Sequence, residues 1–449
     1  MTANYSLQIT EQIKSLLVTD LSEGFRKFYP EEKIRSFLTK ENRRDRIYND
    51  ETTLLTMILT AVQQDKSLQN SVNILSELHK NNIQKIELKL AEIKEEAQKQ
   101  DVDSHRKRGR PRKYEVKVAK SKLKEISTNT GSYTTARKRV GMELVQAVYE
   151  DSADFQSIDT NNKWKGMYVN ITDGTYLQLQ DTKEIRKIYE LKSKSGEEKS
   201  GYPQALFQAI IEQGSGAVKH FELGSRNVSE LKLISILLSK IKAGTLLLAD
   251  DLYNSYAIFY LIRKYGLELM VPGKRVRNYK VIKTISKGDE IVEIMKTKHP
   301  DWLPATEELP KSIIMRRIVV ENPNVPGKEY ILYTTLLDET IDKADIALKY
   351  LTRWDIEISI REMKTLMDLN VIRSKTPEMV LKELMVGLIA YNLMRKIMAN
   401  ATENSNFSPQ EHIVQKCYSS GKTILMDKKG RIYSRWSPGR YGRTTAKDI

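Results

Sequence analysis

Apolar residues in the first hundred positions follow the spacing of amphipathic helices. They recur every three or four residues at 54–62, at 72–78 and again at 83–97, the period that places side chains on one helix face. The last stretch contains only two heptads, so packing against a neighbouring helix is favoured over a coiled coil. The N-terminal region is therefore predicted to be helical.

From about residue 165 the pattern changes to the alternation typical of strands. Three strands are predicted first, at 167–173, 207–213 and 217–224, and the last two are joined by a Gly-Ser-Gly turn. The elements predicted after them are a helix, a strand, a helix and a strand, at 227–242, 244–249, 255–266 and 267–272. This order favours an α/β fold, a mixed sheet flanked by helices.

The rest of the chain contains a second strand-rich stretch and two helices. Strand-like pieces between 274 and 335 predict a β-rich insertion. A long helix is predicted at 342–369, and an apolar helix at about 378–399 follows Thr376 and Pro377, a favourable N-cap and first-turn pair. The tail from about 421 is basic and rich in Gly, Ser and Arg, so it is predicted to be irregular.

The charge of the chain narrows the choice of partners. The 449 residues include 74 Lys and Arg and 58 Asp and Glu, which gives a formal net charge of +16. Nucleic acid is the first partner to expect, and an anionic membrane surface the second. No apolar run approaches a membrane span and the N-terminus lacks signal-peptide regions, so a cytoplasmic or nucleoid location is expected. Cys417 is the only cysteine, which excludes an internal disulfide and a cysteine-based zinc site.

Basic residues are concentrated at 104–113, where six of ten residues are Arg or Lys and none is acidic. Gly109 and Pro111 oppose regular structure, so the segment is interpreted as an exposed linker. Its core, with Arg108, Arg110 and then Arg112, resembles an AT-hook that lies in a narrow A·T minor groove. A solvated linker that contacts phosphates without specificity is the alternative.

Two aspartates stand where predicted strands end. Asp173 closes the first predicted strand, and Asp250 follows the most apolar strand of the chain. The carboxyl ends of strands in α/β sheets are where ligands collect, and carboxylates there often bind metal ions. Either residue could instead be an ordinary turn or helix-capping Asp.

Four polar residues share one face of the predicted helix at 342–369. They are Tyr350, Arg353, Glu357 and Lys364. At ~100° per residue they fall within an arc of about 60°, and the apolar residues lie on the opposite side. The alternative is a solvated face with an i,i+4 ion pair between Arg353 and Glu357, but that alternative does not account for the tyrosine or the lysine.

This spacing, Tyr-x2-Arg-x3-Glu-x6-Lys, resembles the signature of bacterial insertion-sequence DDE transposases of the insertion sequence four group. ITDGT around Asp173 and LLLADDLYNSY around Asp250 look like the family's two aspartate motifs. The chain departs from the family at Asp251, where Arg is common. Asp250 aligns best because Ala249 precedes it and Tyr253 follows at the expected distance, so Asp251 is the second choice.

The resemblance implies a ribonuclease-H-like fold in which Asp173, Asp250 and Glu357 hold two Mg²⁺ ions, with Mn²⁺ as a substitute. The site would cut at transposon ends and join the 3′ hydroxyl to target DNA. Tyr350, Arg353 and Lys364 would contact DNA phosphates, and pairing two inverted-repeat ends implies a homodimer. Trp302 could stack on an extruded base, although packing is favoured. A nuclease without strand transfer and a domesticated DNA-binding protein are the alternatives.

The resemblance and the patterns together predict six regions. They are a helical region that binds DNA ends (1–103), the basic linker (104–125), the first part of the catalytic domain (126–273), the β-rich insertion (274–335), the catalytic domain completed by the signature helix (336–375), and a C-terminal helical region with a basic tail (376–449).

Overall fold

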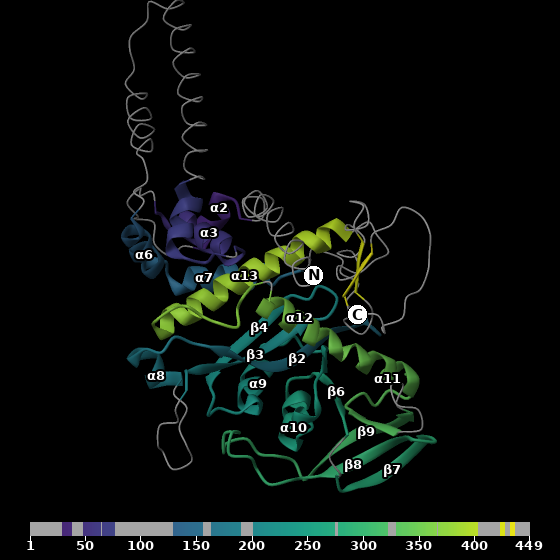
Figure 1. The fold of residues 1–449 in the computed structure, drawn as a ribbon. Helices are drawn as coiled ribbons and strands as arrows, with labels where there is room; N and C mark the ends of the chain where they lie inside the picture. Colours follow the sequence, from purple (N-terminus) through teal and green to yellow (C-terminus); the bar gives the residue numbers. More distant parts are fainter. Residues whose placement is uncertain are drawn as a thin grey trace, which may run out of the picture. The chain divides into compact units, whose positions relative to one another are not determined.

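The computed structural model describes residues 29–37, 48–63, 65–76, 129–155, 163–189, 201–273, 277–321, 329–365, 367–402, 423–426 and 432–435. The chain divides into two compact units, Met1–Asp151 with Leu381–Leu393 and Ser152–Val380 with Met394–Ile449 (Figure 1). The basic linker, the predicted seam at 83–97 and Cys417 lie outside the described residues. Within the described ranges no helix is long and apolar enough to cross a membrane.

The described residues of the first unit form helices joined by turns and contain no strand, as predicted. It contains α2 (Glu31–Ser36), α3 (Asp50–Ala61), a helical stretch at 68–76, α6 (Thr130–Arg139) and α7 (Met142–Ser152). Asn49 caps α3, because its Oδ1 accepts a hydrogen bond from the Thr52 amide at 2.7 Å. Lys382 of α13 (Pro377–Thr402) is fully buried and donates to the Val140 carbonyl at 2.8 Å, beside the C-terminus of α6. That cation satisfies backbone acceptors that the helix end leaves open.

The second unit is built on a ten-stranded mixed sheet. Its strands are β1 (Lys163–Trp164), β2 (Met167–Gln178), β3 (Gln204–Glu212), β4 (Val218–Ser225), β5 (Leu246–Leu248), β6 (Glu268–Pro272), β7 (Tyr279–Ser286), β8 (Asp289–Met295), β9 (Ser312–Glu321) and β10 (Glu329–Thr334). Their order is β4-β3-β2-β5-β6-β10-β9-β8-β7, with β1 beside β2. The pairs β2–β5 and β5–β6 are parallel and the other pairs are antiparallel.

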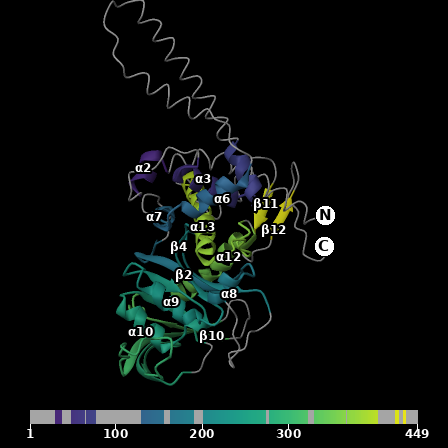
Figure 2. The ribbon, with the colours of Figure 1, turned by 90° about the vertical axis from the view of Figure 1, so that its left-hand side faces the viewer.

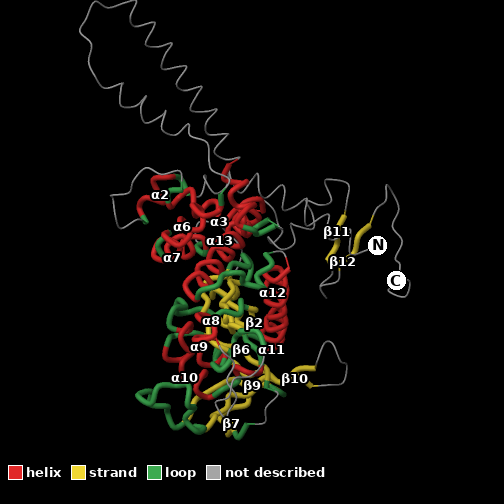
Figure 3. Tube along the Cα trace, turned by 60° about the vertical axis from the view of Figure 1, so that its left-hand side comes forward, coloured by secondary structure: helices red, strands yellow, loops and turns green. Residues whose placement is uncertain are grey.

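Helices lie on both faces of this sheet. The helices and 3₁₀ turns of the unit are α8 (Lys183–Tyr189), α9 (Glu230–Leu238), η1 (Asp251–Tyr253), α10 (Tyr256–Lys264), α11 (Lys343–Leu351), η2 (Thr352–Trp354) and α12 (Asp355–Thr365). Figure 3 shows α9 and α10 on one side of the strands and α12 on the other. The core under α9 and α10 includes Leu237, Phe259, Leu247 and Leu269, all at most 1% exposed. The antiparallel strands β2, β3 and β4 are followed by β5 and β6, which run parallel to β2. With helices on both faces, this arrangement is the ribonuclease-H-like fold that was predicted.

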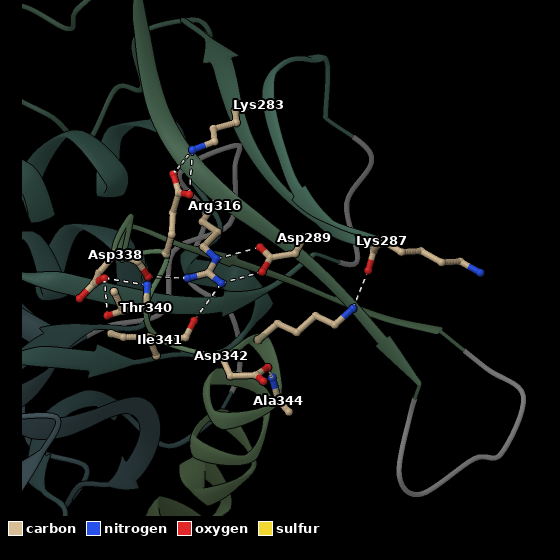
Figure 4. A network of polar contacts seen from close by, with 11 residues as sticks. Lys283, Lys287, Asp289, Arg316, Asp338, Thr340, Ile341, Asp342 and Ala344 are labelled. Atoms are coloured by element: carbon tan, nitrogen blue, oxygen red, sulfur yellow. Dashed lines mark hydrogen bonds and ion pairs between the residues drawn. The ribbon is translucent and has the colours of Figure 1, made fainter.

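The predicted β-rich insertion continues the same sheet, because β10 pairs antiparallel with β6. Arg316 of β9 is 1% exposed, and its guanidinium donates twice to the Asp289 carboxylate, at 2.8 and 2.6 Å. The same guanidinium donates to the Asp338 and Ile341 carbonyls at 2.7 and 2.9 Å (Figure 4). This buried ion pair holds the insertion to the segment that leads into α11, whose N-cap is Asp342.

Three predictions of local structure were wrong. The helix predicted at 342–369 is interrupted by η2, whose tighter 3₁₀ turn changes the direction of side chains after Leu351. Asp173 does not close its strand, because β2 keeps pairing with β3 as far as Gln178. In the tail, predicted irregular, β11 (Thr423–Met426) and β12 (Ile432–Arg435) form an antiparallel pair (Figure 2).

Candidate functional site

Asp173 on β2 and Asp250, just past the end of the neighbouring parallel strand β5, lie at the same level of the sheet. Ile171 of β2 is in register with Leu248 of β5, and each aspartate stands two residues further along its strand direction. Burial raises the pKa of Asp173, and the negative charges of Asp250 and Glu357 raise it further. The hydrogen bond from the Gly174 amide and the charge of Arg353 act in the opposite direction. The charges of Asp250 and of Glu357 on α12 (Asp355–Thr365) therefore both act on Asp173.

Asp250 also has the ordinary role of a helix-capping aspartate, which was the alternative to a metal ligand. It is the N-cap of η1, and its Oδ1 accepts a hydrogen bond from the Leu252 amide at 2.8 Å. That contact accounts for one carboxylate oxygen. Asp251 is the first residue of η1. Burial raises the pKa of Tyr330 on β10, and the charge of Asp251 raises it further. Asp251 is not among the groups that shift the pKa of Asp173.

The helix α12, which carries Glu357, is held beside β2 because the chain after it returns to that strand. The Gln178 amide donates to the Asn370 carbonyl at 2.8 Å, and the Ile372 amide donates to the Gln178 carbonyl at 2.9 Å. These bonds attach the exit of α12 to the end of the strand that carries Asp173. The Glu357 side chain is 43% exposed, and its Oε1 lies 3.7 Å from Nη2 of Arg353.

Tyr350 and Arg353 do not form the open face that the helical spacing predicted. Tyr350 is 3% exposed, and its hydroxyl donates to the carbonyl of Ala249, the residue before Asp250, at 3.0 Å. Arg353 is 9% exposed, and its guanidinium carbon stands 5.1 Å from the centroid of the Trp354 ring. In the part of the chain that the structure describes, the buried Arg353 Nε has no hydrogen-bond partner. The prediction was wrong about the exposure of both side chains, because Tyr350 and Arg353 are both buried rather than lying on an open helix face.

The remaining predicted residues have different outcomes. Lys364 lies half-buried in the last turn of α12. Trp302 packs against the core of the second unit, as its favoured interpretation predicted. Arg108, Arg110 and Arg112 lie outside the described residues. The DNA contacts predicted for the signature residues and the linker stay predictions.

The sequence pattern missed a fourth carboxylate. Glu230 is the first residue of α9, directly after the N-cap Ser229. Burial raises the pKa of Glu230, and the charges of Asp173 and Asp250 raise it further. An acidic residue in the first turn of a helix is common because it suits the helix dipole, so nothing in the sequence separated Glu230 from an ordinary helix start.

Oxygen donors of this kind fit a hard divalent cation such as Mg²⁺. Among the described residues, however, no three His, Cys, Asp or Glu side chains stand close enough to enclose an ion. Mutual repulsion between the carboxylates, and the attraction of Glu357 to Arg353, both favour this wider spacing. A bound cation would offset the repulsion and draw the side chains together.

A family model described as the transposase DDE domain matches residues 164–393. The chain is 27% identical over 312 residues to transposase InsG for insertion sequence element IS4 of Escherichia coli (strain K12), a match that covers 68% of each chain. Among solved structures, the piggyBac transposase synaptic complex with hairpin DNA is similar with a TM-score of 0.39 and 11% identity, covering 88% of this chain and 79% of that one.

Proposed function

The chain belongs to the DDE transposase family, in the insertion sequence four group, and from that premise we propose that it cuts DNA at transposon ends and joins the freed 3′ hydroxyl to target DNA. The observation that carries the proposal is that Asp173 on β2 and Asp250 just past the end of the adjacent parallel strand β5 lie at the same level of the sheet, with Glu357 close enough to shift the pKa of Asp173. These three residues are the proposed catalytic carboxylates. DDE transposases depend on divalent metal ions, and Mg²⁺, with Mn²⁺ as a substitute, is the proposed ion here.

In this proposal the three carboxylates bind two divalent ions. Such a pair of ions activates an attacking oxygen and stabilises the leaving oxygen in an in-line displacement. The protein holds the carboxylate oxygens that would bind these ions in fixed positions. The Gly174 and Leu252 amides each bind one oxygen of an aspartate at 2.8 Å, so both carboxylates have a set orientation and keep a second oxygen for a ligand.

Arg353 and Lys364 are the proposed DNA contacts beside these carboxylates. A buried guanidinium N–H without an acceptor is costly, and a phosphate oxygen would satisfy it through a charge-assisted hydrogen bond. Lys364 lies seven residues after Glu357 in α12, which returns it to the same helix face. Tyr350 holds the Ala249 carbonyl, so its predicted contact with DNA would require that hydrogen bond to open.

A homodimer is the proposed active assembly, because two transposon ends have to be brought together before joining. The discriminating assay for the whole proposal supplies a pre-cut transposon end with a free 3′ hydroxyl, target DNA and Mg²⁺. Joined product is expected. Hydrolysis of uncut ends without any joining would instead identify a nuclease of the same fold.

Replacing Lys364 with Ala should reduce cleavage and joining by roughly 10- to 100-fold, the loss expected when a charge-assisted hydrogen bond worth ~1.5 to 3 kcal/mol is removed. The melting temperature should change little. Arg361→Ala is the matched control, because Arg361 is an exposed cation on the same helix. Equal activity of the two variants would contradict a DNA contact by Lys364.

Arg353→Ala should show a similar activity loss in its folded fraction, together with a lower melting temperature because Arg353 is buried.

Neutralising the basic linker should weaken DNA binding at low salt. The change covers six cations, Arg106, Lys107, Arg108, Arg110, Arg112 and Lys113. The slope of log K against log salt should become shallower by up to about 5 if each of them contacts a phosphate. An unchanged slope would show that the segment does not touch DNA. A larger loss on A·T-rich than on G·C-rich duplex would support the hook interpretation over the plain linker.

A further inference from the structure

A buried polar cluster lies directly behind Asp173, and the three proposed carboxylates do not account for it. Gln208 of β3 is fully buried, and its Nε2 donates to Thr172 Oγ1 and to the Tyr253 hydroxyl, both at 2.8 Å. The Tyr253 hydroxyl in turn donates to Glu230 Oε2 at 3.3 Å. The cluster therefore joins the residue before Asp173, the 3₁₀ turn after Asp250 and the start of α9.

The orientation of the Gln208 amide is fixed by this cluster. Because Nε2 uses its two hydrogens on Thr172 and Tyr253, Oε1 must point the other way. That oxygen is buried, and within the described residues it has no hydrogen-bond partner. Leaving a buried acceptor without a hydrogen bond is destabilising, so it is an unusual group to retain unless something binds there.

Gly174, the residue after Asp173, leaves room for a second oxygen at the same place. A Cβ added to Gly174 would stand 2.6 Å from Cδ of Glu230, 2.8 Å from its Oε2 and 3.0 Å from Oε1 of Gln208. Gly174 is not one of the glycines with positive φ, so its backbone does not require glycine. The requirement is space, and the space is filled by the Glu230 carboxylate.

We propose that Glu230 is a fourth acidic residue of the metal site, directed toward Asp173 and Asp250 by Tyr253 and admitted by Gly174. Two oxygen acceptors, Glu230 Oε2 and Gln208 Oε1, approach the Gly174 Cβ position from two elements, and Gln208 Oε1 has no hydrogen-bond partner among the described residues. Carboxylate and amide oxygens are the ligands of hard divalent cations. The ordinary alternative, an acid that stabilises the N-terminus of α9, explains Glu230 but neither Gly174 nor the unpaired Gln208 oxygen.

This inference rests on the proposed function, and metal binding can test it without turnover. Mn²⁺ affinity of the full chain without DNA is measured by calorimetry. Glu230→Gln should bind Mn²⁺ roughly 10- to 100-fold more weakly, the range found when groups supporting a metal site are replaced. Tyr253→Phe, which removes only the hydroxyl, should also weaken binding. Glu184→Gln is the control, because it neutralises an exposed carboxylate in the first turn of α8 and should leave the affinity unchanged.

Gly174 supplies an independent arm of the same experiment. Gly174→Ala should weaken Mn²⁺ binding about as much as Glu230→Gln does, because the new methyl group displaces the carboxylate. Adding Gly174→Ala to Glu230→Ala should cause little further loss, since the clash is already gone. Fully additive losses would contradict the contact on which the proposal rests.

Comparison with Asp173→Asn separates the two proposals. If Asp173→Asn weakens Mn²⁺ binding while Glu230→Gln, folded by circular dichroism, binds as tightly as Glu184→Gln, then Glu230 is structural and this inference is overturned. If Asp173→Asn and Asp250→Asn also bind Mn²⁺ normally, the proposed function itself has the wrong metal site.

Discussion

Replacing Asp173 or Asp250 with Asn, or Glu357 with Gln, is expected to reduce DNA cleavage and strand transfer by roughly a thousandfold or more. Each change keeps the size of the side chain and removes the charge that attracts a divalent cation. Losing metal-ion stabilisation of the reacting oxygens costs several kcal/mol in the transition state, and each ~1.4 kcal/mol is tenfold in rate. Gel assays with labelled transposon ends measure both steps, and end binding should remain largely intact.

Asp251→Asn is the control for that series. Asp251 carries the same charge one residue further along, yet Asp250 is the neighbour that acts on Asp173. The variant should therefore keep its activity. An inactive Asp251→Asn beside an active Asp250→Asn would show that the wrong aspartate was chosen, and substantial turnover by any of the three triad variants would remove that residue from the site.

Replacing Arg316 with Met is expected to destabilise the second unit by about 3 to 5 kcal/mol, as when one partner of a buried ion pair is removed. Asp289 would then be left 2% exposed without the guanidinium that binds both its oxygens. The loss would also release the Asp338 and Ile341 carbonyls, which precede the helix leading to Glu357. Denaturant unfolding followed by fluorescence measures the change.

The neighbouring Arg317 provides the matched control. Its ion pair with Glu290 is more exposed, with side chains 16% and 23% accessible, and such pairs contribute at most about 1 kcal/mol. Arg317→Met should therefore have a small effect. Replacing Arg316 and Asp289 together with apolar residues should recover much of the stability, because no uncompensated charge remains. Equal destabilisation by Arg316→Met and Arg317→Met would contradict the special role of the buried pair.

The order of strands and helices in the second unit could be predicted from the sequence because its apolar patterns are strong. The run 244–249 is apolar enough to require a buried strand, and Asp250 directly after it had to emerge at the end of that strand. The Gly-Ser-Gly turn between β3 and β4 is also formed as predicted, with positive φ at Gly214 and Gly216. These features depend on residues close together in the chain, where periodicity is informative.

Features that depend on distant residues could not be predicted in this way. Helical spacing placed Tyr350 on an open face, but its hydroxyl is bound to a carbonyl 101 residues away. Glu230 looks like any acidic helix start until Gly174 is seen beneath its carboxylate. The pairing of β10 with β6, which makes the insertion part of the central sheet, likewise has no local signal.

The most direct test of the central claim is to locate the metal ion on the protein. Fe²⁺ bound in place of Mg²⁺, with ascorbate and peroxide, generates radicals that cut the backbone within a short distance of the ion. Cuts are predicted close to residues 173, 250 and 357, and they should disappear with excess Mg²⁺ and in the variant that combines Asp173→Asn, Asp250→Asn and Glu357→Gln. Cuts that lie elsewhere in the chain, or that persist in this triple variant, would contradict a metal site formed by these three carboxylates.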